Sequence, residues 1–224
     1  MLKRNFFFLL LAVAPLSQAS TSIIINKNQP NENVKSAKVV FTGEVTAQKI
    51  TELMSAIDDI NVSFAAVKEI QLYINSYGGE MEAGYMGGEA IKGSRIPIRT
   101  INAAMTGSAA TLIYCAAKNR ETFPGATFLL HPAATPNIQN NYLQKNQITL
   151  LNKEVDKAND IFREVYKHCL KNSDIDMEKV LFSEDNRTYI RYPEALKYGI
   201  ASGVAKHIAP ADVSYYITSP EEKN

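Results

Sequence analysis

The sequence predicts an α/β fold in which helices cover a parallel sheet, and three observations lead to it. Short apolar, strand-like runs alternate with helix-like segments through the middle of the chain, which is the pattern of βαβ units. The glycine pair Gly78-Gly79 follows one of these strand-like runs directly and indicates a turn. A stretch from about Asn141 to Lys171 contains neither Gly nor Pro, which predicts one long helix.

The shorter elements are expected in a regular order along the chain. Each expected strand is a brief apolar run, and turn residues such as Thr42-Gly43-Glu44 separate it from the next helix. Pro193 lies in the first turn of the last short helix and Gly199 ends it. The expected strands are 38–41, 69–74, 98–101, 127–131 and a final one at 203–205, and the expected helices are 47–57, 81–91, 108–117 and 193–196.

The long helix carries an apolar stripe whose members recur at alternating steps of three and four residues. The stripe consists of Ile148, Leu151, Val155, Ala158, Phe162, Val165 and Cys169. Because the stripe is narrow and regular, we expect a helix that projects from the domain and packs on a partner subunit. A core helix lying on the sheet is the alternative.

Composition limits the classes of function. The 224 residues suffice for one sizeable core or two small domains, and the formal net charge of +1 gives no basic excess for nucleic acid. After residue 20 no run is long and apolar enough to span a bilayer. We see no cluster of Cys and His with metal-ligand spacing, so we expect neither metal nor cofactor.

The first 19 residues have the three regions of a secretory signal peptide. Lys3 and Arg4 precede an apolar core, and Ser17-Gln18-Ala19 places small residues where a signal peptidase cleaves. We therefore expect export to the periplasm or the medium, with no stable membrane anchor after cleavage. An uncleaved anchor or a buried N-terminal helix is the alternative. The predicted organisation is a signal peptide over 1–19, a flexible leader over 20–36, one domain over 37–210 and a tail over 211–224.

The chain has two cysteines, Cys115 and Cys169. Export permits a disulfide between them. Cys115 lies in an apolar run, where a buried thiol behaves as a small hydrophobe. We therefore favour two unpaired thiols over a bridge.

Ser108 and His131 are the candidate catalytic residues. Ser108 follows Gly107 at the start of an apolar helix, and His131 ends an apolar strand. Serine acyl transfer needs a hydroxyl that attacks, an imidazole that takes its proton, and backbone N–H groups that hold the oxyanion. Alternatively, Ser108 caps the helix and His131 is a hydrogen-bonded core residue. His168 and His207 have no catalytic context.

Five segments resemble the proteolytic subunit of the Clp protease family. They occur in the family's order, and the resemblance as a whole runs from about Ala37 to Lys206. They are Ile74–Gly79, similar to I-N-S-P-G-G with Tyr77 in place of Pro, then Ala83-Gly84, Gly107–Ala110, Leu129–Pro132, and Pro193–Ile200, similar to P-E-A-x-x-Y-G-L.

The resemblance implies a Clp/crotonase-like fold with the long helix as its handle, and a homo-oligomeric ring that encloses the site in a chamber. It implies a serine-type endopeptidase acting on peptides or unfolded polypeptides. Ser108 would be the nucleophile and His131 the base. Gly79 and Ala109 would supply the oxyanion-hole amides, with Gly78 shaping the turn.

Two departures from the family pattern concern the site. The interval from Ser108 to His131 is short, and an alignment without a gap would place Thr106 at the nucleophile. We prefer Ser108 with a shortened loop near residues 118–120. The family's Asp stands six residues before the Pro of P-E-A, where this chain has Arg187. Of the nearest candidates, Asp185 and Asn186, we choose Asp185 to complete the triad.

The third departure concerns energy supply. Clp-type peptidases take substrate from a cytoplasmic ATP-driven unfoldase, but the leader before Ala37 does not resemble the family's apolar axial loop. The chain has no G-x-x-x-x-G-K-[ST] motif, so it cannot power unfolding itself. We therefore expect ATP-independent hydrolysis and no unfoldase partner. A catalytically impaired scaffold and a crotonase-type acyl-CoA hydratase or isomerase are the alternative functions.

Overall fold

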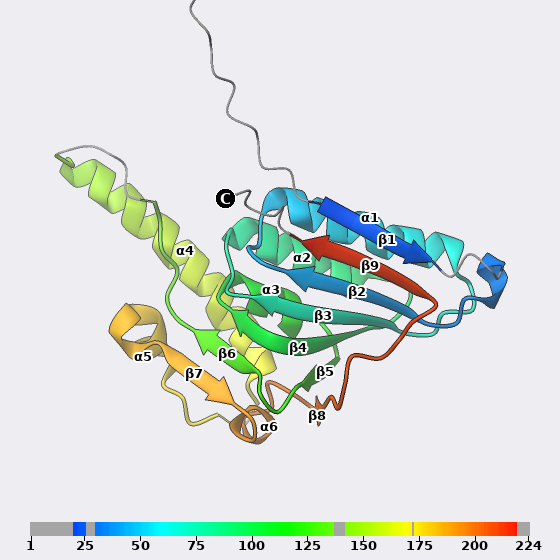
Figure 1. The fold of residues 1–224 in the computed structure, drawn as a ribbon. Coiled ribbons are helices and arrows are strands. Elements are labelled where there is room, and N and C mark those ends of the chain that lie inside the picture. The colour runs from blue at the N-terminus through cyan, green and yellow to red at the C-terminus, as the bar shows by residue number, and fades with distance from the viewer. Residues whose placement is uncertain (1–19, 26–29, 137–141, 172, 219–224) are drawn as a thin grey trace, which may run out of the picture.

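The computed structural model describes residues 20–25, 30–136, 142–171 and 173–218. The predicted signal peptide lies outside these residues. The described chain folds as a mixed sheet with helices packed against one of its faces (Figure 1). Within it, no helix has both the length and the apolarity needed to cross a bilayer.

The strands and helices have the following bounds. The strands are β1 Ser20–Ile25, β2 Ala37–Thr42, β3 Ile70–Ser76, β4 Ile98–Gly107, β5 Asn119–Thr122, β6 Thr127–Leu130, β7 Thr188–Arg191, β8 Gly203–Val204 and β9 Val213–Thr218. The α-helices are α1 Ala47–Ser63, α2 Met81–Gly93, α3 Ala109–Cys115, α4 Lys145–Cys169, α5 Met177–Phe182 and α6 Glu194–Lys197. Two 3-10 turns, Asn31–Asn33 and Glu184–Asn186, complete the described elements.

The described strands form one nine-stranded sheet in the order β1-β9-β2-β3-β4-β5-β8, with β6 between β4 and β7. Strands β2 to β5 are parallel, whereas β1 pairs β9 and β7 pairs β6 in antiparallel fashion. Strand β4 pairs with two strands one after the other: its residues 99–102 pair with β5, and its residues 105–107 pair with β6. The carboxyl end of β4 therefore lies beside β6, which brings the segments that follow these two strands together.

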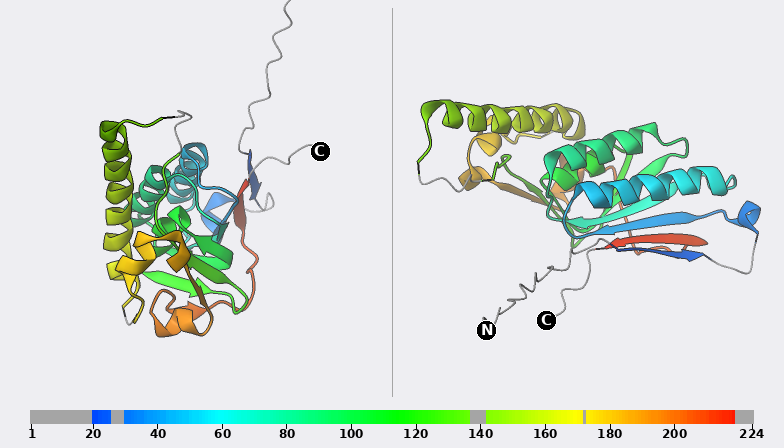
Figure 2. Two further views of the ribbon diagram at one scale, coloured as in Figure 1. Left: turned by 90° about the vertical axis from the view of Figure 1, so that its left-hand side faces the viewer. Right: turned by 90° about the horizontal axis from the view of Figure 1, so that it is seen from above.

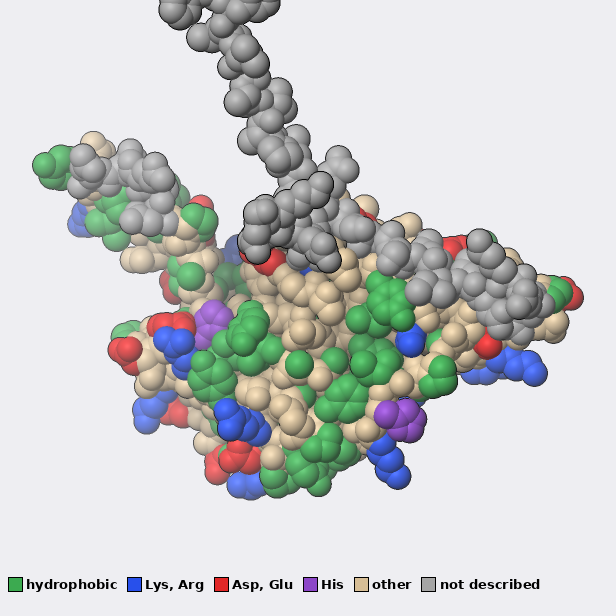
Figure 3. All heavy atoms as spheres, in the orientation of Figure 1, with side chains coloured by type: hydrophobic (Ala, Val, Ile, Leu, Met, Phe, Trp, Pro, Cys, Tyr) green, Lys and Arg blue, Asp and Glu red, His purple; other side chains and the backbone are tan. Residues whose placement is uncertain are grey.

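Helices α1, α2 and α3 lie on one face of the sheet (Figure 2). Helix α1 shows why: Ile50, Leu53, Ile57 and Ile60 recur at steps of three and four residues and are buried. On the other face, apolar side chains gather over the central strands (Figure 3). There the rings of Tyr73 and Phe123 stack at 6.4 Å between centroids, in a second, smaller apolar cluster. The predicted α/β class is confirmed.

Helix α4 projects beyond the sheet, as Figure 1 shows. Its C-terminal half packs on the domain and buries Phe162, Tyr166 and Cys169. Its N-terminal half leaves apolar side chains in solvent, with Ile148 46% and Leu150 58% exposed. The predicted long projecting helix is thus confirmed, and its N-terminal half exposes apolar side chains, of which Ile148 belongs to the stripe and Leu150 lies beside it.

Several elements differ from those that the sequence predicts. Residues 203–204 are not the final strand, because β9 follows within the segment assigned to the tail, and β1 lies within the segment assigned to the flexible leader. Strand β5 replaces the expected loop near residues 118–120. Its sequence is polar, and Arg120 is buried because its guanidinium donates to the carbonyls of Ala117, Gly199 and Ile200. Such a strand has no apolar run to reveal it.

The expectation of two unpaired thiols is wrong, because Cys115 and Cys169 form a disulfide. Their Cα atoms are 5.6 Å apart although 54 positions separate them in the sequence. Cys115 is the last residue of α3 and Cys169 the last residue of α4. The two meet because α4 folds back on α3, and local sequence spacing contains no trace of this long-range contact.

We expect this disulfide to stabilise the fold substantially. Closing a loop of 54 residues lowers the entropy of the unfolded chain by an amount worth about 4 kcal/mol. The double variant Cys115→Ser/Cys169→Ser should therefore unfold at a clearly lower denaturant concentration, with wild type in reducing agent as the matched sample. Equal midpoints for oxidised and reduced wild type would contradict the prediction.

Candidate active site

Ser108 occupies the turn between β4 and α3 in a conformation that is rare for residues other than glycine, with φ 49° and ψ −129°. Such strain persists where the surroundings hold it, and it concentrates at functional sites. Here the Ser108 N–H donates to the carbonyl of Leu129 at 3.0 Å, and the Ser108 carbonyl accepts from the Thr111 N–H at 2.8 Å. The Ser108 hydroxyl caps no helix amide, so helix capping does not explain this serine.

Thr106, the other candidate nucleophile, lies inside β4 and is fully buried. Its strand neighbours are Ser76 on β3 and Phe128 on β6. A hydroxyl that is fully buried has no route to a peptide bond. The geometry therefore favours Ser108.

His131 directly follows β6, whose Leu129 pairs with Gly107 at the end of β4. Ser108 and His131 thus leave the sheet at the carboxyl ends of two neighbouring parallel strands. The imidazole is 22% exposed and can meet a substrate. The described residues show no hydrogen bond between the Ser108 hydroxyl and this ring. In peptidases without substrate such contacts are often long, and they tighten when substrate binds.

The imidazole pairs with Glu184 rather than with Asp185. Nδ1 of His131 lies 3.2 Å from Oε2 of Glu184. The Asp185 carboxylate instead contacts the Ser183 hydroxyl at 3.5 Å, and Asn186 makes no hydrogen bond to the ring in the described structure. The 3-10 turn over residues 184–186 turns its first acidic side chain toward the histidine and its second away. Sequence position alone could not distinguish these adjacent carboxylates.

Arg187 occupies the position where the family pattern expects Asp. Its Nε lies 3.2 Å from Oε1 of Glu184, while the other carboxylate oxygen faces His131. The arginine therefore helps to orient the carboxylate. Both side chains are about half exposed, so the ion pair adds little to stability.

Asn159 on α4 was not singled out from the sequence, yet it ties together the two segments that carry His131 and Glu184. Its Oδ1 accepts from the Ala133 N–H at 2.8 Å, and its Nδ2 donates to the Leu181 carbonyl at 3.2 Å. The side chain is buried. The only signal in the sequence was a polar residue directly beside the apolar stripe.

The glycine turn lies against the nucleophile. A Cβ on Gly78 would approach the Ser108 Cβ to 2.6 Å, and a Cβ on Gly79 would approach the Val45 carbonyl oxygen to 2.2 Å. Both glycines have positive φ, 112° and 147°. The Gly78 N–H donates to the Ser76 hydroxyl at 3.1 Å and is not available to a substrate. In the described backbone, the amides of Gly79 and Ala109 have no acceptor.

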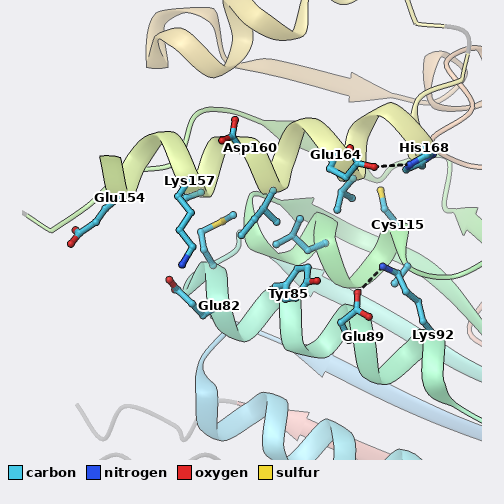
Figure 4. Close-up of a pocket in the computed structure, with 16 residues that line it drawn as sticks. Glu82, Tyr85, Glu89, Lys92, Cys115, Glu154, Lys157, Asp160, Glu164 and His168 are labelled. Atoms are coloured by element: carbon cyan, nitrogen blue, oxygen red, sulfur yellow. Dashed lines mark hydrogen bonds and ion pairs between the residues drawn. The ribbon is translucent and has the colours of Figure 1, made fainter. Parts of the chain in front are cut away.

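A separate groove of about 930 Å³ lies between α2 and α4 (Figure 4). Its floor is apolar and includes Leu112 and Cys115 of α3, while charged side chains such as Glu82, Lys157 and Glu164 form its rim. Neither Ser108 nor His131 lines it. The described residues also contain no group of three His, Cys, Asp or Glu side chains that could hold a metal ion.

Comparison with known proteins identifies the family. The family model of Clp protease matches residues 26–208. The chain belongs to the Clp protease family. It is therefore a serine peptidase by class, which sets aside the acyl-CoA hydratase alternative. Members of this family form homo-oligomeric rings and bind polypeptide substrates.

The similarity to individual Clp proteins is low but extends over most of the chain. ATP-dependent Clp protease proteolytic subunit 2 of Treponema denticola is 25% identical over 193 residues, covering 81% of this chain and 91% of the relative. Subunit 3 of Rhizobium meliloti is 24% identical over 194 residues, covering 86% and 95%. The structure of a ClpP1 variant from Listeria monocytogenes matches with a TM-score of 0.59 at 21% identity, covering 76% and 91%. This structural match shows the same fold.

Proposed function

We propose that this Clp-family chain is an exported serine peptidase that hydrolyses peptides or unfolded polypeptides without ATP. The observation that carries the catalytic part is the strained Ser108. Its hydroxyl caps no helix, and it lies next to two unpaired amides and at the strand end neighbouring His131. This arrangement contains each part that serine acyl transfer requires.

The proposed reaction has two halves, acylation of Ser108 and hydrolysis of the acyl-enzyme, and the chain's own residues catalyse both. Oγ of Ser108 attacks the scissile carbonyl while Nε2 of His131 takes the hydroxyl proton. The carboxylate of Glu184 accepts a hydrogen bond from Nδ1–H and so fixes the imidazole tautomer. The amides of Gly79 and Ala109 stabilise the tetrahedral oxyanion. His131 then protonates the leaving amine, and water hydrolyses the acyl-enzyme by the same steps.

Two independent features support export. Residues 1–19 have the composition of a signal peptide. The disulfide between Cys115 and Cys169 requires an oxidising compartment to form and persist. A bacterial periplasm or the extracellular medium provides such conditions, so we place the mature chain there.

We expect the mature chain, starting at Ser20, to cleave a fluorogenic peptide at the same rate with and without ATP. The exported compartment lacks ATP, and the sequence has no nucleotide-binding P-loop. The assay adds a cytosolic unfoldase in one arm and compares an unfolded protein with a stably folded one. Strict dependence on ATP and unfoldase, or retention of the full chain in the cytoplasm with residues 1–19 intact, would contradict the proposal.

We also propose that the chain assembles into a homo-oligomeric ring through α4. The exposed apolar residues of its N-terminal half, including Ile148 and Leu150, are suited to burial against another subunit.

Val155→Asp should convert the assembly into small species, because an unpaired charge in an apolar contact costs several kcal/mol. Lys153→Asp, which places the same side chain on the opposite face of the helix, is the matched control. Light scattering measures the outcome, and a wild type that is monomeric at micromolar concentration would rule out the proposal.

A further inference from the structure

A chain of buried hydroxyl groups connects α4 to the nucleophile turn. The Tyr166 hydroxyl lies 2.8 Å from Oγ1 of Thr111. The same Oγ1 donates to the Ser108 carbonyl at 2.6 Å. Thr111 is fully buried and Tyr166 is 1% exposed, so water does not compete for these hydrogen bonds.

The direction of the donors follows from proton counting. A threonine hydroxyl has one proton, and here it goes to the Ser108 carbonyl. Tyr166 must therefore donate to Thr111. Burial raises the pKa of Tyr166, so the phenol keeps the proton that it donates. Because hydrogen bonds in a chain polarise one another, the bond from Tyr166 strengthens the bond from Thr111 to Ser108.

The Ser108 carbonyl belongs to the same peptide unit as the Ala109 N–H. A trans peptide is planar, with its C=O and N–H pointing in opposite directions. Two donors, the Thr111 amide at 2.8 Å and the Thr111 hydroxyl at 2.6 Å, hold the carbonyl from one side. Fixing this carbonyl fixes the direction of the Ala109 N–H, which has no acceptor of its own in the described structure.

The disulfide holds α3 and α4 together beside the hydrogen bond between Thr111 and Tyr166. Cys115 comes four residues after Thr111, and Cys169 comes three residues after Tyr166. Residues at these spacings share one face of a helix. The hydrogen bond and the disulfide therefore join the same two faces of α3 and α4. A groove lies between α4 and α2 (Figure 4). The hydrogen bond and the disulfide instead join α4 to α3, so α3 can transmit the position of α4 to the turn that carries Ser108.

We propose that Thr111 and Tyr166 are positioning residues, which orient the peptide unit between Ser108 and Ala109 so that the Ala109 N–H points at the oxyanion. The inference rests on the proposed function, because it assumes that Ser108 is the nucleophile. It adds to that function a structural link between the long helix and the oxyanion hole. Neither residue touches the substrate, so both act through Ser108 and Ala109.

The test compares Tyr166→Phe and Thr111→Val in the full mature enzyme. Tyr166→Phe removes one hydroxyl and keeps the ring stacked on Phe162, whose centroid lies 5.3 Å away. Each variant should lower kcat about tenfold with KM unchanged, since the affected amide stabilises the transition state and loss of a whole oxyanion donor costs more. The rate of labelling by a fluorophosphonate, whose phosphoryl oxygen occupies the oxyanion hole, should fall by the same factor.

The double variant should be no slower than either single variant, because both remove the same hydrogen-bonded chain. Thr111→Ser, which keeps the hydroxyl, should restore kcat. Tyr114→Phe is the matched control, since this buried tyrosine on the same helix donates instead to the Glu121 carbonyl at 3.0 Å, and it should leave kcat unchanged.

Three outcomes would overturn the inference. The first is wild-type kcat in Tyr166→Phe and Thr111→Val while Ser108→Ala is inactive, which leaves the proposed function standing. The second is an equal loss of kcat in Tyr114→Phe, or a loss that Thr111→Ser does not restore, because either result indicates a general packing effect. The third is an active Ser108→Ala enzyme, which would overturn the proposed function and this inference together.

Discussion

Ser108→Ala is expected to abolish covalent labelling by a fluorophosphonate and to lower kcat by about four to six orders of magnitude, because the covalent route is lost. The hydroxyl is the only group of Ser108 that the substitution removes. The backbone bonds of Ser108 to Leu129 and Thr111 do not need it, so the fold should persist. Intact-mass measurement after labelling locates the adduct, and a peptide assay gives the rate.

Thr106→Val is the matched control for this prediction. The Thr106 hydroxyl is buried without a hydrogen-bond partner among the described groups, so replacing it with a methyl group should be neutral or slightly stabilising. Labelling and kcat should remain at the wild-type level. Labelling that survives Ser108→Ala and disappears in Thr106→Val would reverse the assignment of the nucleophile.

The elements that the sequence predicted well are those whose burial follows a simple period. Helix α1 and strands β2 and β3 bury regular apolar patterns. The sequence predicts both strands to within two residues, whereas α1 begins where predicted and ends at Ser63, six residues beyond the predicted end. Strand β5 was missed because a buried arginine and backbone carbonyls fix it rather than an apolar run. Strand β9 alternates in Val-Ser-Tyr-Tyr-Ile-Thr and was detectable. The prediction of a tail over 211–224 overlooks this alternation.

The residues of the candidate site also fall into two groups, those that the local sequence reveals and those that depend on contacts between distant segments. Ser108, His131, Gly78 and Gly79 lie at the ends of strands, where short motifs determine the backbone, and local sequence was enough to single them out. The partner of His131 and the disulfide depend on where α4 and α5 return to the domain. These are contacts between distant segments, and one sequence contains no measure of their distance.

Glu184→Gln tests the partner of His131 and should lower kcat about a hundredfold. The carboxylate oxygen 3.2 Å from Nδ1 accepts a hydrogen bond from Nδ1–H, which leaves the unprotonated Nε2 to act as the base. An amide can present an N–H instead, which favours the wrong tautomer. We expect less than the 10⁴-fold loss known for a buried triad carboxylate, because the Glu184 side chain is 51% exposed and water can partly replace it.

The neighbouring variant Asp185→Asn makes the comparison decisive, because it removes the same charge one residue away. The Asp185 carboxylate contacts Ser183 and not the imidazole, so kcat should stay within about twofold of wild type, the range of an exposed substitution. KM should change little in either variant, since neither side chain is assigned to bind the peptide. If Asp185→Asn lowers kcat and Glu184→Gln does not, the assignment of Glu184 is wrong and Asp185 is the carboxylate that orients His131.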